Sequence, residues 1–136
     1  MSGALSPGAS DGGALRRSVL VVDDDRDIRE TLQELLEQEG YLVATAKNGL
    51  DALARARDER PAVILLDLFM PEMDGMEFRQ RQLLDPELAP IPVVVVSAAV
   101  GVEERVAALG ISAHLEKPLQ LERLLQIVAA HCTLPS

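Results

Sequence analysis

The most constraining feature of this chain is a set of short, uninterrupted apolar runs, each followed by a polar residue. Val19–Val22, Val63–Leu66 and Val93–Val96 contain only aliphatic side chains. Runs of this length and composition suit strands that are buried on both faces of a sheet. Segments with helical spacing separate the runs. Alternation of such strands with helices is typical of a parallel sheet covered on both sides, so we predict an α/β fold.

Helix signals fill the intervals between these runs. Asp25, Asn48 and Asp74 each precede apolar residues at helical spacing, and these residue types are preferred N-caps. Asp74 is followed three residues later by Glu77, as in a capping box. The apolar face of the helix after Asn48 is expected to contain Leu50, Leu53, Ala54 and Ala56. Further strands are expected over residues 41–46 and 113–116, and further helices over residues 103–109 and 121–128.

Polar side chains gather where the predicted strands end. Asp23 and Asp24 follow the first run, Asp67 follows the run at residues 63–66, and Ser97 follows the run at residues 93–96. Lys117 comes directly after the last expected strand. In a parallel sheet the carboxyl ends of the strands share one edge, where ligands commonly bind. We therefore expect these side chains to form one site.

Aspartates predominate in this expected site. Asp23, Asp24, Asp25 and Asp67 would lie at one sheet edge, where like charges repel unless a cation neutralises them. Asp25 is better explained as the N-cap of the following helix. Carboxylate oxygens favour a hard ion such as Mg²⁺. The sequence therefore predicts a divalent metal site.

Composition limits the other functions that the chain could have. Its 136 residues suit one domain, and a net charge of −9 argues against a nucleic-acid-binding surface. Cys132 is the single cysteine, so an internal disulfide is excluded and a reducing, cytoplasmic location is expected. No apolar run approaches the roughly 20 residues of a membrane span. Residues 1–15 are predicted to be a flexible leader and residues 16–136 the domain.

The motifs together resemble the receiver domain of two-component response regulators. Residues 21–25, 65–75, 95–98 and 116–119 carry the resemblance, in the family's order and at its approximate spacing. The resemblance implies a five-stranded, doubly wound, flavodoxin-like sheet with strand order 2-1-3-4-5. It also implies a signalling switch that takes a phosphoryl group from a phosphohistidine of a sensor kinase or phosphotransfer protein. Catalysis would be limited to phosphorylation and dephosphorylation of the chain itself.

The resemblance also assigns roles to individual residues. Asp67 would be the phosphoacceptor, and the metal, Mg²⁺ or Mn²⁺, would be held by Asp23, Asp24, Asp67 and the backbone carbonyl of Phe69. Ser97 would be the hydroxyl that moves onto the phosphoryl group, and Lys117 the cation that pairs with it. A downstream protein would bind the face formed by the fourth helix, the fifth strand and the fifth helix. The resemblance also allows a homodimer after phosphorylation, and neither nucleic acid nor membrane is expected as a partner.

Three features depart from the usual family pattern, one of them the apolar residues Phe69 and Ala99 expected to flank the phosphate site. Ser97 replaces the more frequent threonine but keeps the hydroxyl, so the switch should survive. His114 occupies the fifth-strand position at which the family often has an aromatic residue that reports the switch. A histidine at this position puts that aromatic readout in question, and it suggests the hypothesis that partner binding depends on pH.

Two other functions compete with the receiver interpretation. The order Asp23, Asp24, Asp25 contains the Asp-x-Asp of haloacid-dehalogenase-type phosphohydrolases, which would make Asp23 the nucleophile. Arg26 and Asp27 then stand where that family expects other residues, and the chain leaves no room for a substrate cap. The second alternative is a binding module that keeps the fold but works without phosphorylation. Modules of that kind usually lack an acidic or lysine position, and all of these positions are present here.

Overall fold

The computed structural model describes residues 18–68, 70, 73–97, 110–111 and 113–132. The leader predicted over residues 1–15 and the helix predicted over residues 103–109 lie outside the described residues. The remaining predicted elements can be compared with the structure directly.

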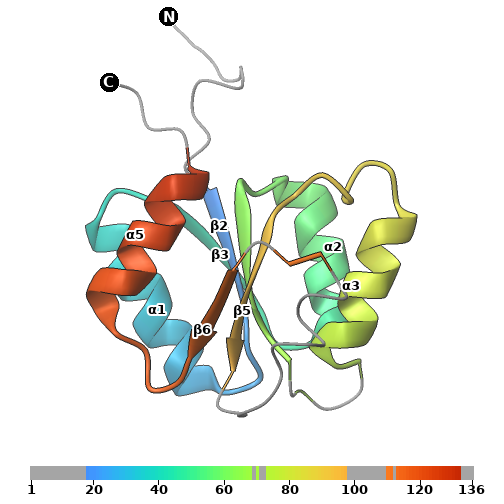
Figure 1. Ribbon diagram of the computed structural model, residues 1–136. Helices are drawn as coiled ribbons and strands as arrows, with labels where there is room; N and C mark the ends of the chain where they lie inside the picture. The colour runs from blue at the N-terminus through green and yellow to red at the C-terminus, as the bar shows by residue number, and fades with distance from the viewer. Residues whose placement is uncertain (1–17, 69, 71–72, 98–109, 112, 133–136) are drawn as a thin grey trace, which may run out of the picture.

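Five parallel strands form a single sheet at the centre of the molecule (Figure 1). Their spatial order is β3-β2-β4-β5-β6, which is 2-1-3-4-5 in order of appearance along the chain and confirms the predicted doubly wound topology. The strands are β2 (Ser18–Val22), β3 (Leu42–Ala46), β4 (Val63–Asp67), β5 (Val93–Ser97) and β6 (Ala113–Glu116).

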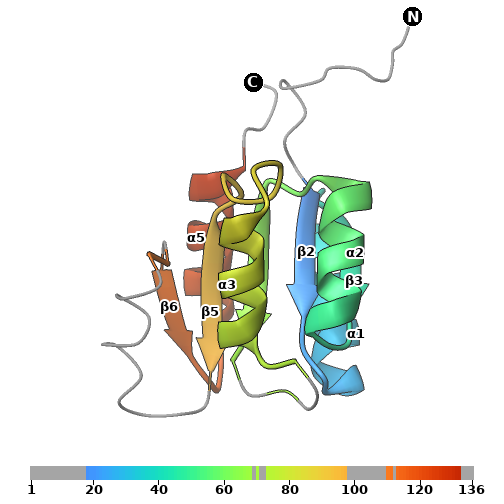
Figure 2. The same ribbon diagram turned by 90° about the vertical axis from the view of Figure 1, so that its right-hand side faces the viewer.

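Helices cover both faces of this sheet. The described helices are α1 (Arg26–Gln38), α2 (Gly49–Glu59), α3 (Gly75–Leu84) and α5 (Leu121–His131). Helices α1 and α5 lie on one face and α2 and α3 on the other, as Figures 1 and 2 show. Across the described part of the chain, no helix has both the length and the apolar character needed to cross a membrane.

The core consists of two apolar layers, one on each side of the sheet. Nearly every residue of β2, β4 and β5 is buried, which agrees with their unbroken apolar sequences. The outer strands β3 and β6 are partly exposed because each has a strand neighbour on one side only among the described residues. With 2% aromatic residues, the chain builds this core mainly from aliphatic side chains and methionine, and Phe78 and Tyr41 are the aromatic residues among its described members.

Three predicted helix caps are confirmed by hydrogen bonds. The side chains of Asp25, Asn48 and Asp74 accept hydrogen bonds from backbone amides two or three residues further on, at 2.8–3.3 Å. The carboxylate of Glu77 pairs with Arg81 at 3.2 Å. Each cap satisfies an amide that the first helical turn leaves without an intrahelical partner.

One predicted helix face is partly wrong. Leu50, which is 56% exposed, and Ala54 lie on the surface of α2, although Leu53 and Ala56 are buried as expected. The buried face of α2 is centred on Gly49, Ala52, Leu53 and Ala56. At about 100° per residue, Leu50 falls to the side of that face.

A buried polar network ties α3 to the rest of the fold. The Nε2 of Gln82 donates to the carbonyls of Leu88 and Ile91, both at 2.9 Å. Arg79 donates to Oε1 of Gln82 at 2.8 Å and to the carbonyl of Gly110 at 3.0 Å. Burial lowers the pKa of Arg79 from its ordinary value. These bonds satisfy backbone carbonyls that would otherwise be costly to bury.

Candidate functional site

Strand register brings the predicted polar residues to one edge of the sheet. Asp67 is the last residue of β4 and Asp23 follows β2 directly. Val22, which directly precedes Asp23, pairs with Leu66, which directly precedes Asp67. The two aspartates therefore lie at the same level of the sheet. Ser97 ends β5 and Lys117 follows β6. The predicted gathering of these residues at the carboxyl ends of the strands is therefore confirmed.

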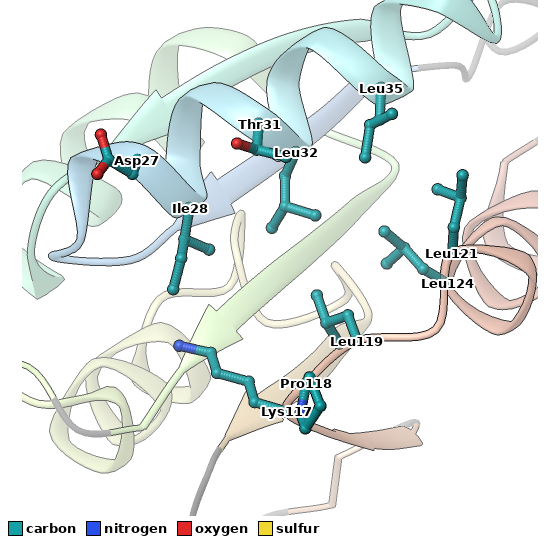
Figure 3. Close-up of a pocket in the computed structure, with 10 residues that line it drawn as sticks. All are labelled: Asp27, Ile28, Thr31, Leu32, Leu35, Lys117, Pro118, Leu119, Leu121 and Leu124. Atoms are coloured by element: carbon teal, nitrogen blue, oxygen red, sulfur yellow. The ribbon is translucent and has the colours of Figure 1, made fainter.

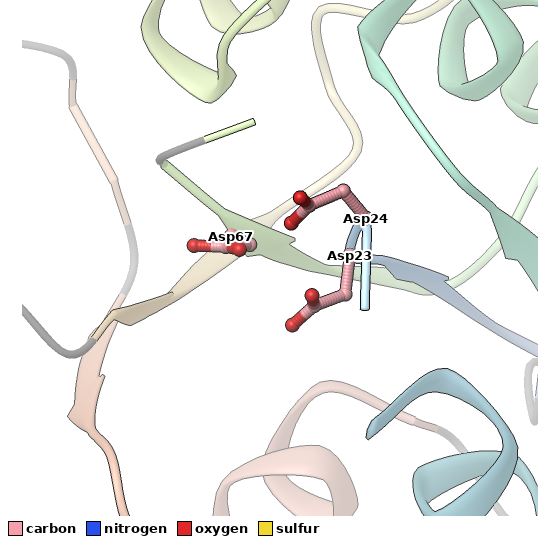
Figure 4. A group of neighbouring side chains, drawn as sticks. All are labelled: Asp23, Asp24 and Asp67. Atoms are coloured by element: carbon pink, nitrogen blue, oxygen red, sulfur yellow. The ribbon is translucent and has the colours of Figure 1, made fainter. Parts of the chain in front are cut away.

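Three of the aspartates form a compact acidic cluster. Carboxylate oxygens of Asp23, Asp24 and Asp67 lie within 4.8 Å of one another. Figure 4 shows that the three side chains extend into the same space. Asp23 and Asp67 are buried and Asp24 is exposed, so the cluster is open to solvent on one side. The oxygen donors fit a hard divalent cation such as Mg²⁺. Asp25, the helix cap, is not part of the cluster.

Lys117 is the cation that faces this cluster. Its Nζ lies 3.0 Å from Oδ2 of Asp23 and 3.7 Å from Oδ2 of Asp67. Burial alone would lower the pKa of Lys117, but the hydrogen bond to Asp23 and the charges of Asp23, Asp67 and Asp24 raise it above its ordinary value. Lys117 therefore stays positively charged at neutral pH. The peptide bond between Lys117 and Pro118 is cis.

Ser97 lies beside Lys117 through the backbone. The amide of Lys117 donates to the carbonyl of Ser97 at 2.9 Å, and the side chain of Ser97 is completely buried. In the β5–β6 register, Ser97 pairs with Glu116 and Val95 with His114. A movement of the β5 end would therefore be transmitted directly to β6.

The two remaining predicted site residues have different outcomes. Phe69 lies outside the described residues. His114 is half-buried on β6, and within the described part of the chain its buried Nε2 has no hydrogen-bond partner. A buried ring nitrogen without a hydrogen-bond partner is energetically unfavourable.

A glycine that sequence analysis did not single out brings α3 against the site. The amide of Gly75 donates to the carbonyl of Leu68 at 3.0 Å. A Cβ atom on Gly75 would lie 2.6 Å from the backbone oxygen of Asp67 and 2.8 Å from Cα of Leu68. Both neighbours are backbone atoms, so neither can move without displacing the end of β4. In the sequence, Asp74 indicates the start of a helix, but nothing there indicates how closely Gly75 approaches β4.

Comparisons with known proteins agree with this geometry. A sequence model of the response regulator receiver domain matches residues 19–129. The polar-differentiation response regulator DivK of Brucella anthropi is 35% identical over 117 residues, which cover 85% of this chain and 95% of DivK. The response regulator MprA of Mycobacterium ulcerans is 43% identical over 110 residues, 79% of this chain. The chain spans 46% of the length of MprA.

Solved structures support the same assignment. The chemotaxis protein CheY4 of Vibrio cholerae has a TM-score of 0.77 and 33% identity, covering 84% of this chain and 97% of CheY4. The response regulator TrrA of Thermotoga maritima, solved in complex with Mg²⁺ and BeF, has a TM-score of 0.75 and 26% identity, covering 84% of this chain and 97% of TrrA. The chain belongs to the receiver-domain family of response regulators, which are phosphorylation-activated switches of two-component systems.

Replacing Gly75 with alanine tests the close approach of α3 to the site. Alanine has the higher helix propensity, by about 1 kcal/mol at most. Overpacking against the backbone of Asp67 and Leu68 should outweigh that gain, because such insertions typically cost about 1–3 kcal/mol. We expect Gly75→Ala to lower the free energy of unfolding in urea. The exposed Gln80→Ala on the same helix should change it by less than about 0.5 kcal/mol. A Gly75→Ala protein as stable as the wild type would contradict this packing argument.

Proposed function

We propose that this chain receives a phosphoryl group on Asp67 from a phosphohistidine and then changes its partner-binding surface. The donor would be a sensor histidine kinase or a histidine phosphotransfer protein. The main support is the position of Asp67, whose carboxylate lies within 4.8 Å of Asp23 and Asp24 and 3.7 Å from the amine of Lys117. Two acidic ligands and one cation around a carboxylate are what phosphoryl transfer to that carboxylate requires.

The transfer step follows from the chemistry of the two groups. A carboxylate oxygen of Asp67 forms a bond to phosphorus while the bond between phosphorus and the imidazole nitrogen breaks. The imidazole keeps the electron pair of that bond, and Asp67 becomes an acyl phosphate. The modification adds about −1.5 to −2 charge and several strong acceptors at the edge of the sheet.

Mg²⁺, or Mn²⁺ in its place, is the proposed cofactor. Asp23, Asp24 and Asp67 would hold it, together with the backbone carbonyl of Phe69. The bound ion would neutralise phosphoryl oxygens and favour in-line attack. The presence of Mg²⁺ and BeF in the TrrA structure supports this proposal.

Lys117 and Ser97 would act on the phosphoryl group after transfer. The amine of Lys117 already faces Asp67, so it can pair with a phosphoryl oxygen. The hydroxyl of Ser97 would donate a hydrogen bond to another oxygen and draw the end of β5 inward. Because β5 pairs with β6, that movement would reach His114 and the face formed by β6 and α5. A downstream protein would bind this face.

We also propose that the chain acts as a switch and not as an enzyme on separate substrates. Its catalysis would be confined to its own phosphorylation and dephosphorylation. A cytoplasmic location fits the single buried thiol of Cys132, whose pKa is raised by burial to about 11. We further propose that the chain can form a homodimer after phosphorylation.

An apolar groove beside the site suits the phosphodonor. The groove lies between α1 and α5, with a volume of about 400 Å³, and Lys117 stands at one end of it (Figure 3). Its apolar lining is formed by Ile28, Leu32, Leu35, Leu119, Leu121 and Leu124. A helix of the phosphodonor protein that lay in this groove would be next to Lys117, whose amine faces Asp67. We propose this surface as the docking site of the histidine-phosphorylated protein.

Intact mass after incubation with a phosphoramidate donor tests the proposed function. We expect one added phosphoryl group on the wild type in the presence of Mg²⁺. We expect none without the metal and none on Asp67→Asn, because each sample lacks a component of the reaction. The absence of any adduct on the folded wild type would favour the phosphorylation-independent module. An adduct that persists on Asp67→Asn would point instead to Asp23 and the hydrolase.

Leu121→Ala tests the docking groove. Leu121 is 43% exposed at the start of α5, so truncation should disturb the core little. Transfer from a histidine phosphoprotein that phosphorylates the wild type should slow by about tenfold, because an apolar contact is lost. Phosphorylation by phosphoramidate should not change.

Leu84→Ala is the matched control for that variant, because Leu84 is 84% exposed on α3, across the sheet from the groove. It should leave both rates unchanged. Equal transfer rates for Leu121→Ala and the wild type would exclude this docking surface.

A further inference from the structure

Arg29, on α1, contacts the turn that carries Asp23 and Asp24. Its Nη1 donates a hydrogen bond of 2.8 Å to the backbone carbonyl of Asp23, six residues earlier in the chain. The side chain is half-buried, and the donor is charged. Charged donors make shorter and stronger hydrogen bonds than neutral ones. The first helix is thereby fastened to the turn that carries two of the three clustered carboxylates.

The polar groups of Asp23 are all engaged. Its amide donates to the carbonyl of Ala46 at 3.1 Å, and its Oδ1 accepts from the amide of Asp25 at 2.9 Å. Its Oδ2 accepts from Lys117 at 3.0 Å, and its carbonyl accepts from Arg29. Two of these four partners are side chains, and they differ in where they act. Lys117 binds the side-chain carboxylate of Asp23, whereas Arg29 binds its main-chain carbonyl.

The two bonds to Asp23 are expected to behave differently during phosphoryl transfer. Lys117 also faces Asp67 at 3.7 Å, so pairing with a phosphoryl group would weaken its bond to Asp23. The bond from Arg29 involves no atom that takes part in transfer and can persist throughout. The position of the turn would then depend on Arg29.

We infer that Arg29 is a positioning residue that holds the Asp23–Asp24 turn in the geometry needed to bind Mg²⁺. The inference rests on the proposed Mg²⁺-dependent phosphorylation. The guanidinium does not touch the metal or the phosphoryl group. It acts through the main chain of Asp23, as an outer partner of a metal ligand.

Removal of Arg29 is predicted to change the Mg²⁺ affinity in the direction opposite to the one expected from its charge alone. Arg29 is a cation close to a cation-binding site, so removal of its charge alone would strengthen Mg²⁺ binding. If Arg29 positions the turn, its removal should weaken Mg²⁺ binding instead. Loss of an outer partner typically costs about ten- to a hundredfold in metal affinity.

The test is the Mg²⁺ dissociation constant of the full chain, measured by calorimetry, for the wild type, Arg29→Met and Arg29→Lys. We expect Arg29→Met to bind Mg²⁺ at least about tenfold more weakly than the wild type. Arg29→Lys keeps the positive charge but replaces the planar guanidinium with a single ammonium group on a flexible chain. Its Mg²⁺ affinity should therefore lie between those of the wild type and Arg29→Met. If Arg29→Met does not fold, as judged by thermal melting without metal, Arg29→Lys alone decides.

Arg26→Met is the matched control. Arg26 lies on the same helix and carries the same charge, but it is 77% exposed and pairs with Glu30 at 2.9 Å. It should bind Mg²⁺ as tightly as the wild type or slightly more tightly. Wild-type affinity in a folded Arg29→Met or in Arg29→Lys would overturn the inference. Failure of the wild type to bind Mg²⁺ would instead overturn the proposed metal dependence.

Discussion

Repulsion among three carboxylates within 4.8 Å of one another is the constraint on which the rest of the site depends. Their approach is imposed by the sheet, because Asp67 ends β4 and Asp23 directly follows the adjacent parallel strand β2 in matching register. The positive charge of Lys117 offsets part of this repulsion. The carboxylates in turn raise the pKa of Lys117 and so favour its charged form. The remaining negative charge is what a divalent cation would neutralise. The Mg²⁺ ion that we propose for this site would neutralise this charge through oxygen ligands that the fold already brings together.

Much of the fold and of the site could be predicted because the informative signals are local. Unbroken aliphatic runs identify β2, β4 and β5, and Asp25, Asn48 and Asp74 mark helix starts by the chemistry of their own side chains. Parallel topology then brings the strand ends together without any knowledge of contacts. The residues at those ends follow from the sequence order alone.

Most of the features that escaped prediction depend on contacts between a side-chain position and backbone atoms of another segment. The carbonyl that Arg29 binds and the oxygen that leaves no room for a side chain on Gly75 have no signature in residue identity. Gln82 is an ordinary polar residue in the sequence, yet it is buried because two carbonyls of the following loop need donors. Leu50 was misplaced since an apolar residue near the edge of a helix face can point either way. Contacts of this kind become visible only when the elements are packed.

The most direct test of the account is to locate the phosphoryl group on the chain. Borohydride reduces an aspartyl phosphate to homoserine, so peptide mass spectrometry after phosphorylation and reduction identifies the modified residue. The account predicts homoserine at position 67, with Asp23 and Asp24 unmodified. Homoserine at position 23 would contradict it, because the nucleophile would then lie on β2's side of the cluster and Asp67 would serve only as a ligand.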